Sequence, residues 1–203
     1  MGMSIPYQFG ASGVNGGHYS AAAQSGLMAA GIASAAQVFQ VRWASSSKIF
    51  GLKQLKIQCS TCTGFAATTI GAPLQLWVGH ASTANGSGGT ALAPTSVGPK
   101  YRTSMTSTEF VTGGEIRVAT TAALTAATGQ ALEPLAYSGC MGADNRTLVS
   151  TGEMYLFDQR EIGDHPLLLQ NGDTLAILTL SPAATGTWTF AVSMKWFEAT
   201  AYA

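Results

Sequence analysis

The sequence predicts an all-β protein, namely an antiparallel β-sandwich that is jelly-roll-like and carries an extended N-terminal arm. Three observations support this fold class. Short apolar runs are separated by turns rich in Gly, Ser, Thr and Pro, and eight or more of these runs fit strands. Between Trp188 and Trp196, large apolar residues alternate strictly with small or polar ones. No segment shows the repeat of a convincing amphipathic helix.

Residues 1–36 are predicted to form the arm, which becomes ordered only against a partner. This segment carries no charged residue and is rich in Gly, Ala and Ser. Its alanines favour a helix, but Gly26 and Gly31 interrupt it. Its larger apolar side chains are spaced by small residues, so we expect them to contact a sister subunit or another partner. These candidate interface residues are Tyr7, Phe9, Tyr19, Leu27 and Met28. The alternative is a first strand and a helix packed on the domain itself.

Residues 37–203 are predicted to form the sandwich domain, because regular alternation begins there. Pro73 marks the start of one strand, and the glycine-rich stretch 85–89 predicts a flexible loop. The expected strands are Val38–Trp43, Ile49–Cys59, Leu74–Val78, Glu115–Ala119, Met154–Phe157, Leu175–Leu180 and Thr187–Trp196.

The last two predicted strands are joined by a loop that contains Pro182 and Gly186. Two runs with this type of connection predict an antiparallel hairpin. The final strand gathers two tryptophans, Phe190, Val192 and Met194 on one face. Such a face needs a second layer to cover it, so we expect it to lie inside the sandwich.

Composition limits the classes of partner. The chain has 203 residues, enough for one domain that needs no metal or disulfide. Only 10% of residues are charged, and 10 basic residues balance 10 acidic ones. Nucleic acid is therefore not expected as a partner, because binding phosphates needs a basic surplus. A neutral, weakly charged surface favours a homo-oligomer within an assembly. No apolar run of about 18 residues predicts a membrane span.

Three cysteines do not define a disulfide framework. Cys59 and Cys62 have the spacing of a metal-binding pair, but a structural zinc site needs four ligands, and only Cys140 and a histidine remain to complete it. We therefore expect two small buried or half-buried residues at a strand end, with reduced thiols and no metal.

Candidate catalytic groups are scattered. His18, His80 and His165 lie outside any motif, and no G-x-S-x-G nucleophile elbow occurs. Carboxylates that suit glycoside hydrolysis or calcium binding lie in one loop-rich region near Arg146 and Arg160, which favours salt bridges instead. These carboxylates are Glu153, Asp158, Glu161, Asp164 and Asp173. Trp43 and Trp77 are candidates for a sugar-binding face, although buried aromatic residues are commoner. We expect no enzyme activity, no catalytic residue and no cofactor.

Several stretches together carry a family resemblance. They are Gln24–Gly31, Val38–Trp43, Gly88–Leu92, Arg102–Met105, Ile116–Leu124, Leu156–Asp158, His165–Leu169, Gly186–Phe190 and Lys195–Trp196. In this order they resemble a group of virion proteins of tailed bacteriophages, over most of the chain. Met1–Gly17 departs from the group as an extra extension. The resemblance implies a virion structural role, and jelly rolls are common among viral capsid domains.

The resemblance does not by itself distinguish head from tail. Together with the neutral surface and the predicted arm, it leads us to expect a capsid decoration (cement) protein that forms a homotrimer, with the arm contacting a sister subunit or the capsid. It would be made in the cytoplasm of the host bacterium and would bind the major capsid protein on the exterior of the assembled head. An alternative of another class is a tail-tip or fibre module that recognises a host surface glycan, which requires exposed aromatic residues in a groove. A third is an enzyme acting on polysaccharide, which requires a clustered pair of acids.

Overall fold

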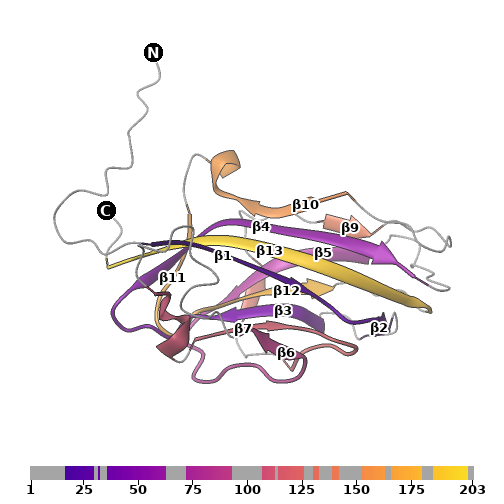
Figure 1. The fold of residues 1–203 in the computed structure, drawn as a ribbon, viewed down its shortest axis with the longest axis horizontal. Coiled ribbons are helices and arrows are strands. Elements are labelled where there is room, and N and C mark those ends of the chain that lie inside the picture. Colours follow the sequence, from indigo (N-terminus) through magenta and orange to yellow (C-terminus); the bar gives the residue numbers. More distant parts are fainter. Residues whose placement is uncertain are drawn as a thin grey trace, which may run out of the picture.

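The computed structural model is nearly all β (Figure 1). It describes residues 17–29, 32, 36–62, 72–92, 107–112, 114–125, 130–132, 139–141, 152–162, 166–179 and 185–200. Over these ranges the chain forms strands and two short 3-10 helices, η1 (Glu109–Thr112) and η2 (Gln159–Ile162), and no α-helix. The strands build two antiparallel sheets that pack against each other, which confirms the predicted all-β sandwich.

The first sheet, called sheet A, is centred on the two longest strands. Its hydrogen-bonded order is β1 (Gly17–Gln24), β13 (Thr187–Ala199), β4 (Ile49–Thr61) and β10 (Met154–Asp158). Two short strands extend it, because β2 (Met28–Ala29) pairs with β13 and β11 (Leu167–Leu169) pairs with β4. The central β13–β4 pairing runs from Trp188 opposite Thr61 to Ala199 opposite Ile49.

The second sheet, called sheet B, contains seven strands. Its order is β6 (Thr90–Leu92), β7 (Glu115–Val118), β3 (Ala36–Arg42), β12 (Thr174–Thr179), β5 (Ala72–Gly79) and β8 (Gln130–Leu132). The seventh strand, β9 (Gly139–Met141), also pairs with β5. The strands expected around Val38, Leu74, Ile116 and Ile177 all lie in this sheet.

The order of the strands is that of a jelly roll. The chain passes repeatedly from one sheet to the other. Sheet A contains β1, β4, β10 and β13, and sheet B contains β3, β5, β8 and β12. The two sheets therefore contain the interleaved orders β1-β13-β4-β10 and β3-β12-β5-β8, an eight-stranded double Greek key. The jelly-roll expectation is confirmed, with β6 and β7 added beside β3.

The predicted hairpin between the last two strands is wrong. Strand β12 lies in sheet B, where it pairs with β3 on one side and with β5 on the other. Both of its edges are thus occupied, and β13 pairs with β1 and β4 in sheet A instead. Strands β12 and β13 are thus consecutive in the chain but lie in different sheets, which local sequence does not distinguish from a hairpin.

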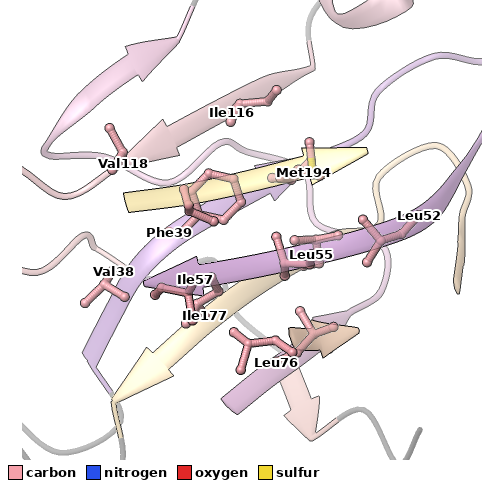
Figure 2. Packing of buried hydrophobic residues seen from close by; sticks show 14 of the residues in the cluster. Val38, Phe39, Leu52, Leu55, Ile57, Leu76, Ile116, Val118, Ile177 and Met194 are labelled. Carbon is pink, nitrogen blue, oxygen red and sulfur yellow. The ribbon is translucent and has the colours of Figure 1, made fainter. Parts of the chain in front are cut away.

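The core lies between the sheets and is supplied by the alternating residues of both. Figure 2 shows Leu55 and Ile57 of β4 in one buried cluster with Phe39 of β3 and Ile177 of β12. The expected inner face of β13 is confirmed, because its five large apolar residues from Trp188 to Trp196 are buried, each at most 3% exposed.

One end of the core is aromatic. The Trp43 ring meets Phe110 edge-on, with 5.0 Å between centroids. Phe50 stacks on Trp196 at 5.9 Å, and Tyr19 stacks on the same tryptophan at 5.5 Å. Contacts of this geometry add stability beyond the area they bury. They join β1, β3, β4, β13 and η1 at this end of the sandwich.

The predicted arm is wrong for its described part, residues 17–29. Strand β1 pairs with β13 over its whole length, from Gly17 opposite Glu198 to Gln24 opposite Ala191. Tyr19 and Met28 are fully buried in the core of their own chain, so they are not available for the predicted intersubunit contacts. Leu27 is 54% exposed and remains a candidate interface residue. Tyr7 and Phe9 lie outside the described residues. The alternative of a first strand packed on the domain is correct, although strand β2 follows it and not a helix.

Candidate partner-binding face

The predicted metal and thiol residues occupy ordinary structural positions. Cys59 is buried in β4 and Cys62 is half-buried just beyond its end, and both are free thiols. Burial raises the pKa of Cys59 to about 12, so its thiol is protonated and unreactive near neutral pH. Within the described ranges, no group of three or more His, Cys, Asp or Glu side chains is placed to hold a metal ion.

The candidate acids and bases form separate pairs. His80 Nδ1 lies 3.2 Å from Asp173 Oδ1 in an exposed contact between two loops. Lys56 Nζ lies 2.8 Å from Glu153 Oε2. Arg160 forms a two-pronged contact with Asp158, of 3.2 Å from Nε to Oδ1 and 2.9 Å from Nη2 to Oδ2. The expectation of salt bridges is confirmed for Glu153 and Asp158. The partner of Asp173 is His80, which is charged only when protonated, and Glu161 forms no ion pair within the described chain. Arg146, Asp164 and His165 lie outside the described residues.

Of the two tryptophans considered for sugar binding, Trp43 is fully buried, and its Nε1 donates to the backbone oxygen of Lys48 at 2.8 Å. Trp77 is half-buried, and its Nε1 donates to Gln75 Oε1 at 3.2 Å. Trp43 is therefore a core residue and cannot face a ligand.

The two sheets differ in how their outer faces are covered. In sheet B, every residue of β12 is buried, as are the residues of β3 from Ala36 to Val41. Loop segments that contain Gly86 and Thr125 lie over Gln40 on this side, joined by a bridge between Ser87 and Thr125. In sheet A, strands β1 and β13 alternate between buried and partly or fully exposed residues over much of their length. Sheet A therefore has an open outer face, and we consider it the candidate site.

The centre of this face is a shallow groove of about 370 Å³. Its floor contains Ala191 and Ser193 of β13, which are flanked by longer side chains of the neighbouring strands. The pairing register places Gln24 of β1 and Gln58 of β4 on either side of Ala191. Lys56 of β4 lies beside Ser193. The groove thus forms because the outward-facing side chains are small on the central strand and long on its two neighbours.

One wall of the groove is a compact polar cluster at the sheet edge. Tyr155 of β10 lies opposite Lys56 in the register. The Lys56 ammonium lies 4.7 Å from the centroid of the Tyr155 ring, a cation–π contact, and also pairs with Glu153. The hydrogen bonds that Lys56 donates to Glu153 and Tyr155 raise the pKa of Lys56. The wall is therefore fixed by contacts within the chain and carries little net charge.

Beyond the groove, the same face becomes cationic. Lys195 lies between Ser20 of β1 and Gln54 of β4. The β13–β4 register shifts at this point, and Lys53 is the extra residue of the bulge. Leu52 and Leu55 on either side are both buried, so Lys53 and Gln54 share the outer face, as residues of a bulge can.

His18 lies near the two lysines, on the outer side of β1 and opposite Phe197. Partial burial and the nearby charge of Lys53 lower the pKa of His18, so the imidazole is neutral near pH 7. The two lysines therefore carry the charge of this group at neutral pH.

The pair Lys53 and Lys195 was not predicted from the sequence, although the spacing of the neighbouring leucines carries a signal. Leu52 and Leu55 are both inward-facing yet three residues apart, which breaks the two-residue period of a strand and indicates a bulge.

Comparisons with protein-family models, with curated proteins and with solved structures found no match. Within the described residues, no helix is long and apolar enough to cross a membrane.

Proposed function

We propose that this protein is a virion structural protein of a tailed bacteriophage, a capsid decoration (cement) protein. The sequence resemblance, the single jelly-roll domain and the weakly charged composition support this role. Its partner is the major capsid protein, on the exterior of the assembled head, after synthesis in the host cytoplasm. Binding to the assembled shell and not to free capsid subunits stabilises the shell by mass action.

The observation that carries this proposal is the open face of sheet A. Ala22, Ala191 and Ser193 leave its centre low, so the backbone of a partner can approach closely, while polar side chains at the rim supply hydrogen bonds. Sheet B offers no comparable surface over β3 and β12, because both faces of these strands are buried. Sheet A is therefore the face that we assign to the shell.

We further propose that the protein acts as a homotrimer, so that one particle contacts neighbouring capsomers together. The zero formal net charge removes the repulsion that keeps many monomers apart. Leu27, exposed beside the buried Met28, is the described residue best placed to contact a sister subunit. Multi-angle light scattering should give a mass three times that of the 20.9-kDa chain. A stable monomer at micromolar concentration would contradict the trimer.

Sedimentation with preassembled shells tests the function. Shells assembled from the major capsid protein of the same phage are mixed with purified protein and pelleted. Wild-type protein should pellet with the shells, and Ala191→Arg, which fills the groove floor with a long charged side chain, should not. The matched control is Thr83→Arg in the exposed loop after β5, which should pellet like wild type. Wild-type protein that stays in the supernatant would contradict the function.

A second candidate function, recognition of a host surface glycan by a tail-tip or fibre module, is favoured by a different observation. Tyr155, which is 39% exposed, lines a concavity of about 450 Å³ together with Asp158, Arg160 and Glu161. An exposed ring beside convergent charged groups suits a polar ligand with an apolar face, such as a sugar. Tyr155→Ala should abolish retention on immobilised host surface polysaccharide if this function holds. If instead the protein decorates the capsid, wild-type protein should not be retained on that polysaccharide.

A further inference from the structure

The lysines of the described chain fall into two classes. Lys48 and Lys56 both form ion pairs, with Glu109 at 3.1 Å and with Glu153 at 2.8 Å. Lys53 and Lys195 form no ion pair with any described residue, and both lie on the outer face of sheet A. The bulge in β4 brings Lys53 beside the position opposite Lys195, so two unneutralised charges share one small area. Two charges of one sign on the same face favour an anionic partner.

The carboxylate in register with this group does not neutralise it. Asp158 lies opposite Gln54 in the β10–β4 pair. Its Oδ2 accepts a hydrogen bond from Gln54 Nε2 at 3.0 Å, and both of its oxygens are engaged by Arg160. The charge of Asp158 is therefore neutralised by Arg160, and Asp158 does not neutralise the positive charge of Lys53 and Lys195.

A second copy of this chain is a poor source of the missing negative charge. Of the seven described acids, five are paired with Lys48, Lys56, Arg117 or Arg160. Asp173 contacts His80, which neutralises it only when protonated, and Glu161 makes no ion pair within the described chain. Nucleic acid is a poor occupant as well, because the chain carries no basic surplus. An acidic protein surface fits both the charge and the flat shape of the face.

We propose that Lys53 and Lys195 bind acidic side chains on the exterior of the assembled capsid shell, and that these charges orient the open face of sheet A on it. This inference rests on the proposed function and names the chemistry of its partner. The cationic pair steers the encounter and fixes the register, while the groove around Ala191 supplies close contact.

The test is shell binding by the intact protein across salt concentration, from about 50 mM to about 500 mM NaCl. Wild-type binding should weaken as salt rises. The Lys53→Gln/Lys195→Gln double variant should bind about tenfold more weakly at low salt and should lose most of the salt dependence. Lys53→Arg/Lys195→Arg keeps both charges and should behave as wild type. A double Gln variant with wild-type affinity and wild-type salt dependence would overturn the inference.

Binding to poly-L-glutamate, measured without shells, separates failure of this inference from failure of the proposed function. Wild-type protein should be retained on a poly-L-glutamate surface at low salt, and the double Gln variant should not. Retention that depends on the lysines, together with no binding to shells, would refute the capsid role and leave a site for acidic protein surfaces. Equal retention of both proteins would refute the assignment of the two lysines. Unchanged thermal unfolding of the variants confirms that they are folded.

Discussion

The Glu198 carboxylate lies 3.9 Å from the Lys48 ammonium at a point where Glu198 has no contact with solvent. Its Oε1 also accepts hydrogen bonds from the Thr108 hydroxyl and from Trp196 Nε1, and its Oε2 accepts one from the backbone N–H of Glu109. These contacts attach the segment that leads into η1 to the end of β13. An acid buried this deeply is stable as an anion only while its partners remain in place.

Replacing Lys48 with Met should therefore destabilise the fold by about 3 kcal/mol at pH 8, because it leaves a buried charge without a counter-ion. Burial raises the pKa of Glu198 above its ordinary 4.5, so the folded protein holds this proton more readily than the unfolded chain. Stability from this group thus falls as pH rises from 4.5 through the folded pKa. The loss of folding stability caused by Lys48→Met should accordingly be smaller at pH 5, because Glu198 is more often neutral there.

Urea denaturation at both pH values measures the effect of Lys48→Met. Lys195→Met, at an exposed position without an ion pair in the described chain, serves as the control and should change stability by less than about 0.5 kcal/mol. Equal losses for Lys48→Met at pH 5 and pH 8 would show that Glu198 is not the group responsible.

A second prediction concerns acid stability. Hydrogen bonds from Arg160, opposed by burial, hold the pKa of Asp158 down to about 2 from 3.8. The shift corresponds to about 2 kcal/mol of stability, present above pH 3.8 and lost as pH falls through 2. Arg160→Gln should raise the Asp158 pKa, so that the stability lost on acidification is lost at a higher pH. Carboxyl NMR titration reads this directly, and Glu161→Gln should leave the Asp158 pKa unchanged.

Tyr19 should be part of the core and not of an interface. Tyr19→Ala should cost about 3–5 kcal/mol, because the ring is fully buried and stacked on Trp196. Leu27→Ala, at a position 54% exposed, should change stability by less than about 0.5 kcal/mol. Chemical denaturation compares the two. A loss of stability for Tyr19→Ala as small as that for Leu27→Ala would contradict burial of the ring and support the predicted arm.

Gly51 permits a close contact on the outer side of sheet A. A Cβ at this position would overlap the ring of Phe197, which lies opposite it on β13. Gly51→Ala should therefore displace that ring and cost about 1–3 kcal/mol. Gly152→Ala is the matched control, because nothing lies within 4 Å of the added methyl group. Thermal unfolding of the two variants should differ accordingly, and equal melting temperatures would contradict the contact.

Local pattern predicted the strands whose large residues alternate, such as the run from Trp188 to Trp196. It failed for β1, because the inward positions of that strand are Gly17, Tyr19, Ala21 and Ala23, and three of these are too small to form an apolar stripe. Only pairing with β13 identifies β1 as a strand. The same limit explains the hairpin error, since the partners of β12 are β3 and β5, which lie far away in sequence.

The candidate face could not be predicted from the sequence pattern of single strands, for a related reason. Ala191 and Ser193 become a groove floor only when Gln24 and Gln58 are placed beside them by non-local pairing. The cationic group requires the bulge at Lys53 and the register of Lys195 together. Residue type predicted the salt bridge of Asp158, because Arg160 lies close to it in sequence. It did not predict Lys56 as the partner of Glu153, because Lys56 lies on β4, far away in sequence.

The central claim is that this jelly roll coats a capsid shell, and the copy number of the protein in purified virions tests it most directly. Quantitative mass spectrometry of virions, with the major capsid protein as the internal standard, gives that number. We expect hundreds of copies, in a fixed ratio to the capsid protein. A handful of copies per virion would contradict capsid decoration and place the protein at a tail tip.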